Sequence, residues 1–369
     1  MTRPAGVVLD LGDIRITDSS RVGPKLARLG QLASAGWRVP DGYAVTAHAL
    51  EDWLPAAARS ELTRLFSGQV ADQGQVPDPA ELGRQSAQAQ ALVEGQPLPS
   101  WLEDAVTAAH ERLQQRSGRG SGLRVAVRSS AVREDGLEAS FAGQYATYLG
   151  ITGTADVLHH IRRCWASGYA AHALEYRRRA GAHVLDPNDL AVGVLELVDA
   201  RSAGVVFTLD PVTGDRDRLI VEANWGFGES VVSGHVTPDQ WIVDRASGRI
   251  LSRTVGAKRA WSVFDSGAAR VVLAPLPAEL AERACLEDHE VRYLCQKAAE
   301  IEDAEGVAQD VEWAIARSLP FPDSAYILQH RPETTWAATP APAPAPAGPG
   351  KAFDPVQYAL RNVFKVTGT

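Results

Sequence analysis

The chain has 369 residues, a net charge of −8 and 45% hydrophobic residues, which is enough for more than one hydrophobic core. The acidic balance excludes a general nucleic-acid binder, because affinity for a phosphate backbone requires a basic face. No apolar run reaches the roughly 20 residues that a membrane span needs, and the N-terminus, which begins Met1-Thr2-Arg3-Pro4, lacks the apolar core of a signal peptide. We therefore expect a cytoplasmic protein that binds neither nucleic acid nor a membrane.

The cysteines exclude two further classes of protein. Cys164, Cys285 and Cys295 are too few and too scattered for a disulfide framework or a zinc site. We expect them to be small buried hydrophobic residues.

The first predicted helix follows a short strand at residues 7–11. It opens at Gly23-Pro24-Lys25, and its apolar stripe runs through residues 26, 29 and 32. Proline suits a first helical turn, and a helix N-terminus favours anions. Lys25 is therefore either a phosphate ligand or a solvated surface lysine.

Residues 47–118 are predicted to be mostly helical, and residues 101–113 form an amphipathic helix. A polar segment rich in Gln, Pro and Gly at residues 67–99 is expected to interrupt the helices.

An apolar strand at residues 123–127 leads into Arg128, Ser129 and Ser130. A small-residue loop at 140–144 and a second apolar run at 145–151 follow. Small residues let backbone N–H groups approach an anion, and an arginine fork matches two phosphate oxygens. The pattern indicates a phosphate-binding site.

A long helix is predicted for residues 156–179. Its last three residues, Arg177 to Arg179, are either a solvated helix end or an anion site. Residues 190–198 read as a strand buried on both faces. Glu196 is unusual there, and it either faces water or lines a ligand cleft.

Three more strands are predicted at residues 203–209, 219–223 and 240–244. Glycine-rich polar loops, such as the one at 225–229, separate them. Strands that end in such loops are typical of an α+β domain with a ligand at the loop ends.

The last predicted elements are a helix at 287–303, stopped by Gly306, and a hairpin of residues 310–314 and 326–331. Alternation places Asp310 and Glu312 on one face, opposite Gln329 and Arg331. Carboxylates bind Mg²⁺ and arginine offsets phosphate charge. The set is therefore either a site for Mg²⁺ and nucleotide phosphates or a cross-strand salt bridge on a wet face.

The end of the chain has a different composition. Residues 339–350 are an Ala/Pro linker. Residues 353–366 have apolar positions at helical spacing and are either a docking segment or a frayed terminus.

Together these motifs resemble the N-terminal nucleotide-binding domain of phosphoenolpyruvate synthase and pyruvate phosphate dikinase, over residues 12–335. Besides the arginine strand with its loop, the most specific stretches are residues 202–211, 225–234, 309–313 and 328–332. The resemblance implies an α+β, ATP-grasp-type fold of two subdomains with the nucleotide between them. Residues 1–190 and 191–336 would be the subdomains, 337–352 the linker and 353–369 the tail.

The resemblance also implies roles for single residues. Lys25, Arg128 and Arg331 would hold the ATP phosphates as catalytic residues, with Gln329 beside them. Glu312, with Asp310, would ligate Mg²⁺. The remaining cofactor contacts would come from the phosphate lid, at Gly143, Gln144 and Thr147, and from the backbone of the adenine strand, at Glu196, Leu197 and Val198.

This sequence departs from the family at four positions. Pro24 and Leu26 replace the glycines that flank the family lysine, and Leu195 stands where many relatives have glutamine. His330 lies where many have serine, and we interpret it as a local substitution. None of the chain's histidines lies in the context of the family's phosphohistidine domain, and the pyruvate-binding barrel is not represented.

The leading hypothesis is therefore an ATP-binding kinase subunit of a split dikinase-like enzyme. It would phosphorylate a histidine on a second subunit and form AMP and Pi, with a phenol or cresol as the final acceptor, as in phenylphosphate synthase, or with pyruvate. A nucleotide-binding regulatory subunit is the second hypothesis. The third is an ATP-grasp ligase that makes an acyl phosphate and releases ADP.

Overall fold

The computed structural model describes residues 6–70, 78–132, 145–179, 189–232, 234, 236–333 and 336. Its contacts divide the chain into two compact units, Met1–Gly36 with Asp41–Leu197, and Trp37–Pro40 with Val198–Thr369. Helices and antiparallel sheets occur in both units, which confirms the α+β class. The predicted linker and tail lie outside the described residues.

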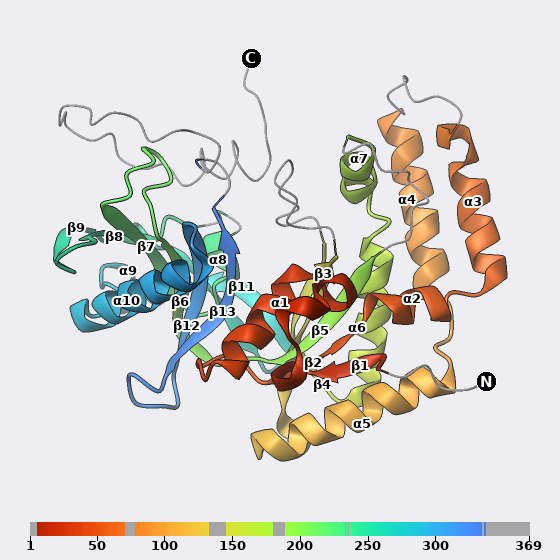
Figure 1. The fold of residues 1–369 in the computed structure, drawn as a ribbon, viewed down its shortest axis with the longest axis horizontal. Helices are drawn as coiled ribbons and strands as arrows, with labels where there is room; N and C mark the ends of the chain where they lie inside the picture. The colour runs from red at the N-terminus through yellow and green to blue at the C-terminus, as the bar shows by residue number, and fades with distance from the viewer. Residues whose placement is uncertain are drawn as a thin grey trace. The chain divides into compact units, whose positions relative to one another are not determined.

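The first unit is built on a five-stranded sheet of order β1-β2-β5-β3-β4, in which all neighbouring strands are antiparallel. Figure 1 shows α1 over this sheet, with the remaining helices of the unit beside and behind it. The elements are β1 (Val8–Asp10), η1 (Leu11–Asp13), η2 (Ile16–Asp18), α1 (Ser19–Ser34), β2 (Gly42–Val45), α2 (Ala47–Trp53), α3 (Ala56–Val70), α4 (Pro79–Glu94), α5 (Ser100–Ser117), η3 (Gly120–Gly122), β3 (Arg124–Ala131), β4 (Thr147–Thr152), α6 (Thr154–Ser167), α7 (Ala171–Arg179) and β5 (Leu190–Glu196).

The core of the first unit lies on the sheet face opposite α1. Val125 and Val127 of β3 and Val192 and Val194 of β5 pack there with apolar residues of α2 to α6. The alternate residues of β3, including Arg128, therefore lie on the α1 face, because neighbours along a strand point to opposite sides.

Two helical predictions in this unit were wrong. The polar segment expected to interrupt the helices contains α4, which Asp78 caps by accepting the Ala80 N–H at 3.1 Å. Its buried face is sparse (Leu82, Ser86, Ala89 and Val93), so the apolar signal is weak. The helix predicted for residues 156–179 is two helices, α6 and α7, separated at residues 168–170.

The arginine run at the end of α7 is not simply a solvated helix end. Arg177 is buried, with 7% of its surface exposed, and its guanidinium donates to the carbonyl of Gly168 and lies over the Tyr169 ring. It therefore closes the turn between α6 and α7.

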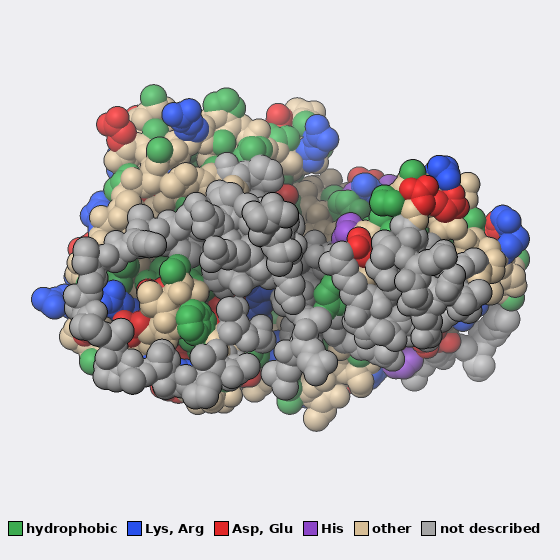
Figure 2. All heavy atoms as spheres, turned by 90° about the horizontal axis from the view of Figure 1, so that it is seen from above, with side chains coloured by type: hydrophobic (Ala, Val, Ile, Leu, Met, Phe, Trp, Pro, Cys, Tyr) green, Lys and Arg blue, Asp and Glu red, His purple; other side chains and the backbone are tan. Residues whose placement is uncertain are grey.

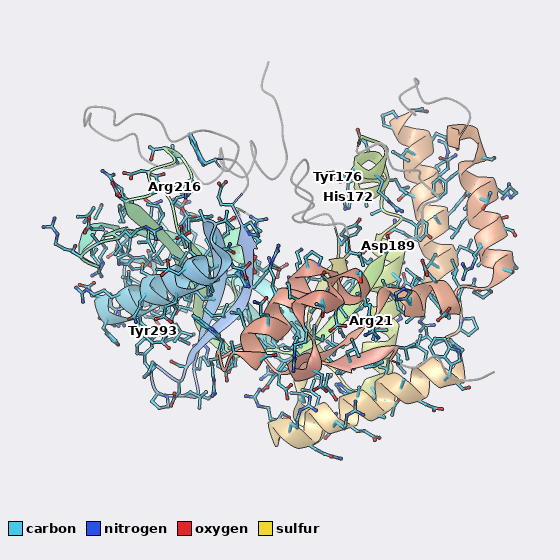
Figure 3. All side chains as sticks on the ribbon, in the orientation of Figure 1. Arg21, His172, Tyr176, Asp189, Arg216 and Tyr293 are labelled. Carbon is cyan, nitrogen blue, oxygen red and sulfur yellow. The ribbon has the colours of Figure 1, made fainter. Side chains whose placement is uncertain are left out.

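The second unit is built on a six-stranded antiparallel sheet of order β13-β12-β6-β7-β8-β9 and a separate β10–β11 ribbon. Helix α10 contacts four of the sheet strands, and its Tyr293, labelled in Figure 3, meets Phe321 edge-on at 5.0 Å. The elements are β6 (Ala200–Phe207), β7 (Arg218–Trp225), α8 (Glu229–Val232), β8 (Asp239–Asp244), β9 (Ile250–Thr254), β10 (Ala260–Asp265), β11 (Arg270–Pro275), α9 (Ala278–Ala281), α10 (Asp288–Glu305), β12 (Gln309–Ala316) and β13 (Ala325–Pro332).

Most predictions for the second unit are confirmed. The strands at β6, β7 and β8, helix α10 and the β12–β13 hairpin all occur, and Gly306 ends α10 at a φ of 71°. Strands β9 to β11 were not predicted, because β9 and β11 are largely exposed and lack a clear apolar alternation.

Three surface and core expectations can be compared with the structure. The cysteines are free and buried, as expected. Within the described part of the chain, no helix has the length and apolarity to cross a membrane. In Figure 2 the acidic and basic side chains of the described residues are scattered, and these residues form no extended basic patch on that face.

Candidate functional site

The start of α1 is kinked where the sequence predicted a phosphate-binding helix. Gly23 has a φ of 76°, and Pro24 follows it, so the regular helix begins at the kink with Lys25 in its first turn. Ahead of the kink, Arg21 donates to the Gly6 carbonyl at 2.8 Å and pairs with Asp18 at 3.2 Å (Figure 3). The predicted helix thus starts one turn earlier, at Ser19, and turns sharply before Lys25.

The kink lies against β3. A Cβ on Gly23 would be 2.3 Å from the Ser130 Oγ and 2.8 Å from the Ser130 carbonyl oxygen. Only a glycine with a positive φ fits there. The Ser130 hydroxyl is buried and has no hydrogen-bond partner among the described residues. This contact brings the helix that carries Lys25 next to the strand that carries Arg128.

Leu26, which the resemblance sets in the place of a family glycine, packs against Gly193. Its Cδ2 lies 2.6 Å from the position that a Cβ on Gly193 would take, and the Arg128 Cγ lies 3.5 Å from the same position. Gly193 and Arg128 are direct neighbours in the sheet. The larger residue therefore fills space left by Gly193 beside the arginine stem, and Lys25 and Arg128 are both half-buried.

Thr147 is an exposed residue at the start of β4 and lies directly opposite Arg128 in the β3–β4 pair. Directly opposite residues share a sheet face, so the structure brings these two predicted residues together. Gly143 and Gln144, also predicted for the phosphate lid, lie outside the described residues.

The predicted adenine strand has most of its backbone donors occupied. The Glu196 N–H donates to the Asp41 carbonyl at 2.7 Å, and the Leu197 N–H donates to the Arg124 carbonyl at 2.9 Å. The Glu196 carboxylate pairs with Arg119 at 3.0 Å. The N–H groups of Glu196 and Leu197 are therefore already used within the protein. An adenine base that accepts a hydrogen bond from this segment would use the N–H of Val198, the next residue along the chain.

The β12–β13 hairpin has the predicted register. Asp310 lies opposite Arg331 and Glu312 lies opposite Gln329. The Arg331 Nε and Nη2 both lie 3.1 Å from the Asp310 Oδ2, and the Gln329 Nε2 donates to the Glu312 Oε1 at 3.3 Å. All four side chains share one face of the sheet.

Asp310 has an unusual environment. Its side chain is buried, and burial raises the pKa of its carboxyl to about 6 although Arg331 opposes the shift. Its second oxygen, Oδ1, is buried and has no hydrogen-bond partner among the described residues. A buried carboxylate oxygen without a partner is costly unless a ligand completes it. The predicted cross-strand salt bridge thus accounts for one Asp310 oxygen, Oδ2. The other oxygen, Oδ1, is left for a ligand to complete.

The hairpin carboxylates fit a magnesium ion. Among the described residues there is no group of three or more His, Cys, Asp and Glu side chains that could hold a metal. Mg²⁺ in nucleotide sites uses only one or two protein carboxylates, and water and phosphate oxygens complete its octahedron. The unpartnered Asp310 Oδ1 and the partly exposed Glu312 supply such a pair.

His330 lies on the opposite face of the hairpin. It is buried, and its Nδ1 lies 3.0 Å from the Gln309 Oε1. A phosphocarrier histidine must reach its substrate, so this geometry agrees with the interpretation of His330 as a local substitution.

One buried acid was not predicted from the sequence. It lies on the same sheet face as Asp310 and Glu312. Glu222 of β7 and its neighbour Gln240 of β8 lie in the row that contains Glu312. The sequence does contain a signal for it, because Glu222 interrupts the apolar run at residues 219–223. No role was predicted for this glutamate.

Comparison with known proteins identifies the class. Residues 19–347 match the family model described as the pyruvate phosphate dikinase AMP/ATP-binding domain, and the chain belongs to this family. The match supports ATP as the bound nucleotide.

Several curated proteins are similar to this chain. A probable phosphoenolpyruvate synthase of Staphylothermus marinus is 35% identical over 350 residues, covering 89% of this chain and 41% of that protein. A rifampicin phosphotransferase of Streptomyces is 37% identical, covering 90% and 36%. A prodigiosin synthesizing transferase of Serratia marcescens is 34% identical, covering 90% and 33%. The chain thus spans less than half the length of these relatives.

Proposed function

We propose that this chain is the ATP-binding kinase part of a phosphoenolpyruvate-synthase-like phosphotransferase, with an ATP-grasp-type arrangement. It would use MgATP to phosphorylate a histidine on a partner subunit, with AMP and Pi as products. The observation that carries the proposal is the hairpin, where a buried acid with an unpartnered oxygen lies beside an arginine, a second acid and an amide. Family membership supports the nucleotide.

The proposed roles follow from charge and position. Asp310 and Glu312 would hold Mg²⁺, which neutralises phosphate charge when bound. Arg331 and Gln329 would donate to phosphate oxygens, and Lys25 and Arg128 would offset further charge on the triphosphate. Phosphoryl transfer depends mainly on such positioned charges. Gly143, Gln144 and Thr147 would belong to the phosphate lid, and Glu196 to Val198 would border the adenine.

The partner and the acceptor are part of the same proposal. Relatives more than twice as long as this chain support a second polypeptide, or further domains, that would carry the histidine and the acceptor site. We propose a phenol or cresol as the final acceptor, with pyruvate as the alternative. Both are small molecules with a hydroxyl or enol oxygen that can take a phosphoryl group.

The test is to mix the full chain, MgATP and the candidate partner, and to measure AMP, ADP and acid-labile phosphohistidine. We expect AMP and phosphohistidine from the wild type and loss of both in Arg331→Met. Arg317→Met is the matched control, because Arg317 follows β12, the other strand of the hairpin, and pairs with Asp199 at the surface. ADP as the product would instead identify a ligase that makes an acyl phosphate. Nucleotide binding without turnover would identify a regulatory subunit.

A further inference from the structure

A row of polar side chains continues from the hairpin across the sheet. Register places Gln329, Glu312, Val205, Glu222 and Gln240 side by side on five consecutive strands. Directly opposite residues share a face. Glu222 therefore faces the same side as the proposed magnesium and phosphate ligands, two strands or about 10 Å from Glu312.

The floor around Glu222 is apolar. Val205, Phe207 and Ile220 form a buried cluster with Ile242, and all four lie on this same face. Glu222 itself is 4% exposed, and the Gln240 Nε2 donates to its Oε1 at 3.2 Å. A single acid is thus set into an apolar floor with one amide partner.

A buried acid on the neighbouring strand shows how a structural carboxylate is satisfied in this unit. Asp239 accepts the N–H groups of Gly256 and Cys285 at 2.9 and 2.8 Å and pairs with the buried Lys258. Glu222 has no such set: within the described part of the chain it has the Gln240 amide as its hydrogen-bond partner. A buried carboxyl with so little compensation is expensive, which favours a role toward a ligand.

We propose that Glu222, oriented by Gln240, receives the ring N–H of the histidine that accepts the phosphoryl group. This inference rests on the proposed function and adds an acceptor subsite to it. A carboxylate that accepts the N–H of one imidazole nitrogen fixes the ring and its tautomer, and so directs the other nitrogen as a nucleophile. The apolar floor is suited to the flat faces of the ring.

The transfer step balances with groups already named. The second ring nitrogen forms a bond to the β-phosphorus of ATP while the bond between that phosphorus and the oxygen of AMP breaks. AMP leaves with that electron pair, and the N–H proton passes to the Glu222 carboxylate. The histidine then carries the β- and γ-phosphoryl groups together, and water cleaves the bond between them, which releases Pi and leaves phosphohistidine. Burial raises the pKa of Glu222 to about 7, so the group can hold this proton near neutral pH.

The test uses imidazole itself as the probe, with the full chain, Mg²⁺ and α,β-methylene-ATP, at a pH near 8 where both groups are in the required form. Imidazole binding is followed by NMR line broadening. We expect saturable binding that Glu222→Gln weakens about tenfold, the loss of one charge-assisted hydrogen bond. Glu279→Gln, at an exposed glutamate of α9, should leave it unchanged.

A second probe separates hydrogen bonding from simple apolar contact. 1-Methylimidazole lacks the N–H, so it should bind about tenfold more weakly than imidazole to the wild type and equally to wild type and Glu222→Gln. Equal binding of the two probes to the wild type, or imidazole binding that is the same in Glu222→Gln, would overturn the inference. Binding of α,β-methylene-ATP, measured in the same samples, reports separately on the proposed function.

Discussion

Asp310 and Arg331 face each other across the β12–β13 ladder, and two guanidinium nitrogens lie 3.1 Å from the same carboxylate oxygen, Oδ2. The other oxygen, Oδ1, is buried and has no hydrogen-bond partner within the described residues. One acid therefore fixes the arginine with one oxygen and leaves the second oxygen without a partner in the described part of the chain. In the proposed site, Asp310 would in this way serve both the metal and the arginine that binds phosphate.

Replacement of Asp310 by Asn should reduce magnesium-dependent nucleotide binding. The amide keeps the volume but loses the charge that ligates Mg²⁺ and fixes Arg331. We expect ATP affinity with Mg²⁺ to fall by about tenfold or more, roughly the 1.5–3 kcal/mol of a hydrogen bond to a charged group, and affinity without Mg²⁺ to change little. Calorimetric titration with and without Mg²⁺ measures both values. Asp244→Asn, at the end of β8 in the same sheet, is the control.

The Asp310 carboxyl should make the affinity for Mg²⁺ with nucleotide depend on pH. Its pKa is raised to about 6 by burial, and Mg²⁺ binds only the ionised form, so protons compete with the metal below that pH. Affinity for Mg²⁺ with nucleotide should fall about tenfold per pH unit below about 6. Asp310→Asn should lack this component, while the titration of the nucleotide is common to both proteins. Parallel curves for the two proteins would contradict the assignment.

The hairpin could be predicted from the sequence because its signals are local. Alternation over residues 310–314 and 326–331 defines which side chains share a face, and the pairing that the structure shows follows from one short loop. The burial of Asp310 could not be predicted, since it depends on how neighbouring elements cover the strand.

Other features depend on contacts between residues distant in sequence. The compensation of Leu26 by Gly193 joins residues 167 positions apart, and the row from Glu312 to Gln240 depends on the order of four strands. Periodicity carries no information about either. Helix α4 was missed for a different reason, since its buried face holds a serine and an alanine among few large apolar residues.

Substitution of Gly23 by Ala should disturb both stability and nucleotide binding. The residue has a φ of 76°, and a Cβ would meet the Ser130 Oγ at 2.3 Å and its carbonyl oxygen at 2.8 Å. We expect a loss of about 2 kcal/mol in the free energy of unfolding and weaker ATP binding, because the helix start that carries Lys25 must shift. Denaturant unfolding and calorimetry measure the two effects.

Gly83→Ala is the matched control for this change. Gly83 lies exposed within α4, and a Cβ there would meet no atom within 4 Å. It should stabilise the protein by about 0.5–1 kcal/mol, since glycine is a poor helix residue. If both variants lose the same stability, the contact with Ser130 does not determine the cost.

His110 of α5 should make the first unit sensitive to acid. Its ring is fully buried, neither nitrogen has a hydrogen-bond partner among the described residues, and burial lowers its pKa below the usual 6.5. The unfolded chain therefore takes up a proton near pH 6.5 while the folded chain does not, and stability falls as the pH drops from there toward the lowered pKa. His110→Leu should remove this loss and add about 1 kcal/mol at pH 7. Urea unfolding at several pH values tests this, and an unchanged slope would count against it.

Leu26 and Gly193 should behave as a coupled pair. Leu26→Ala leaves a cavity and should cost about 2–4 kcal/mol, and Gly193→Ala places a methyl group 2.6 Å from the Leu26 Cδ2 and should cost about 1–3 kcal/mol. In the double variant the added methyl occupies part of the vacated space, so the total loss should be smaller than the sum by about 1 kcal/mol or more. Because Arg128 borders the same space, nucleotide affinity should recover in parallel with stability. Strictly additive losses would show that the two residues do not share the space, and the larger residue at position 26 would then need another explanation.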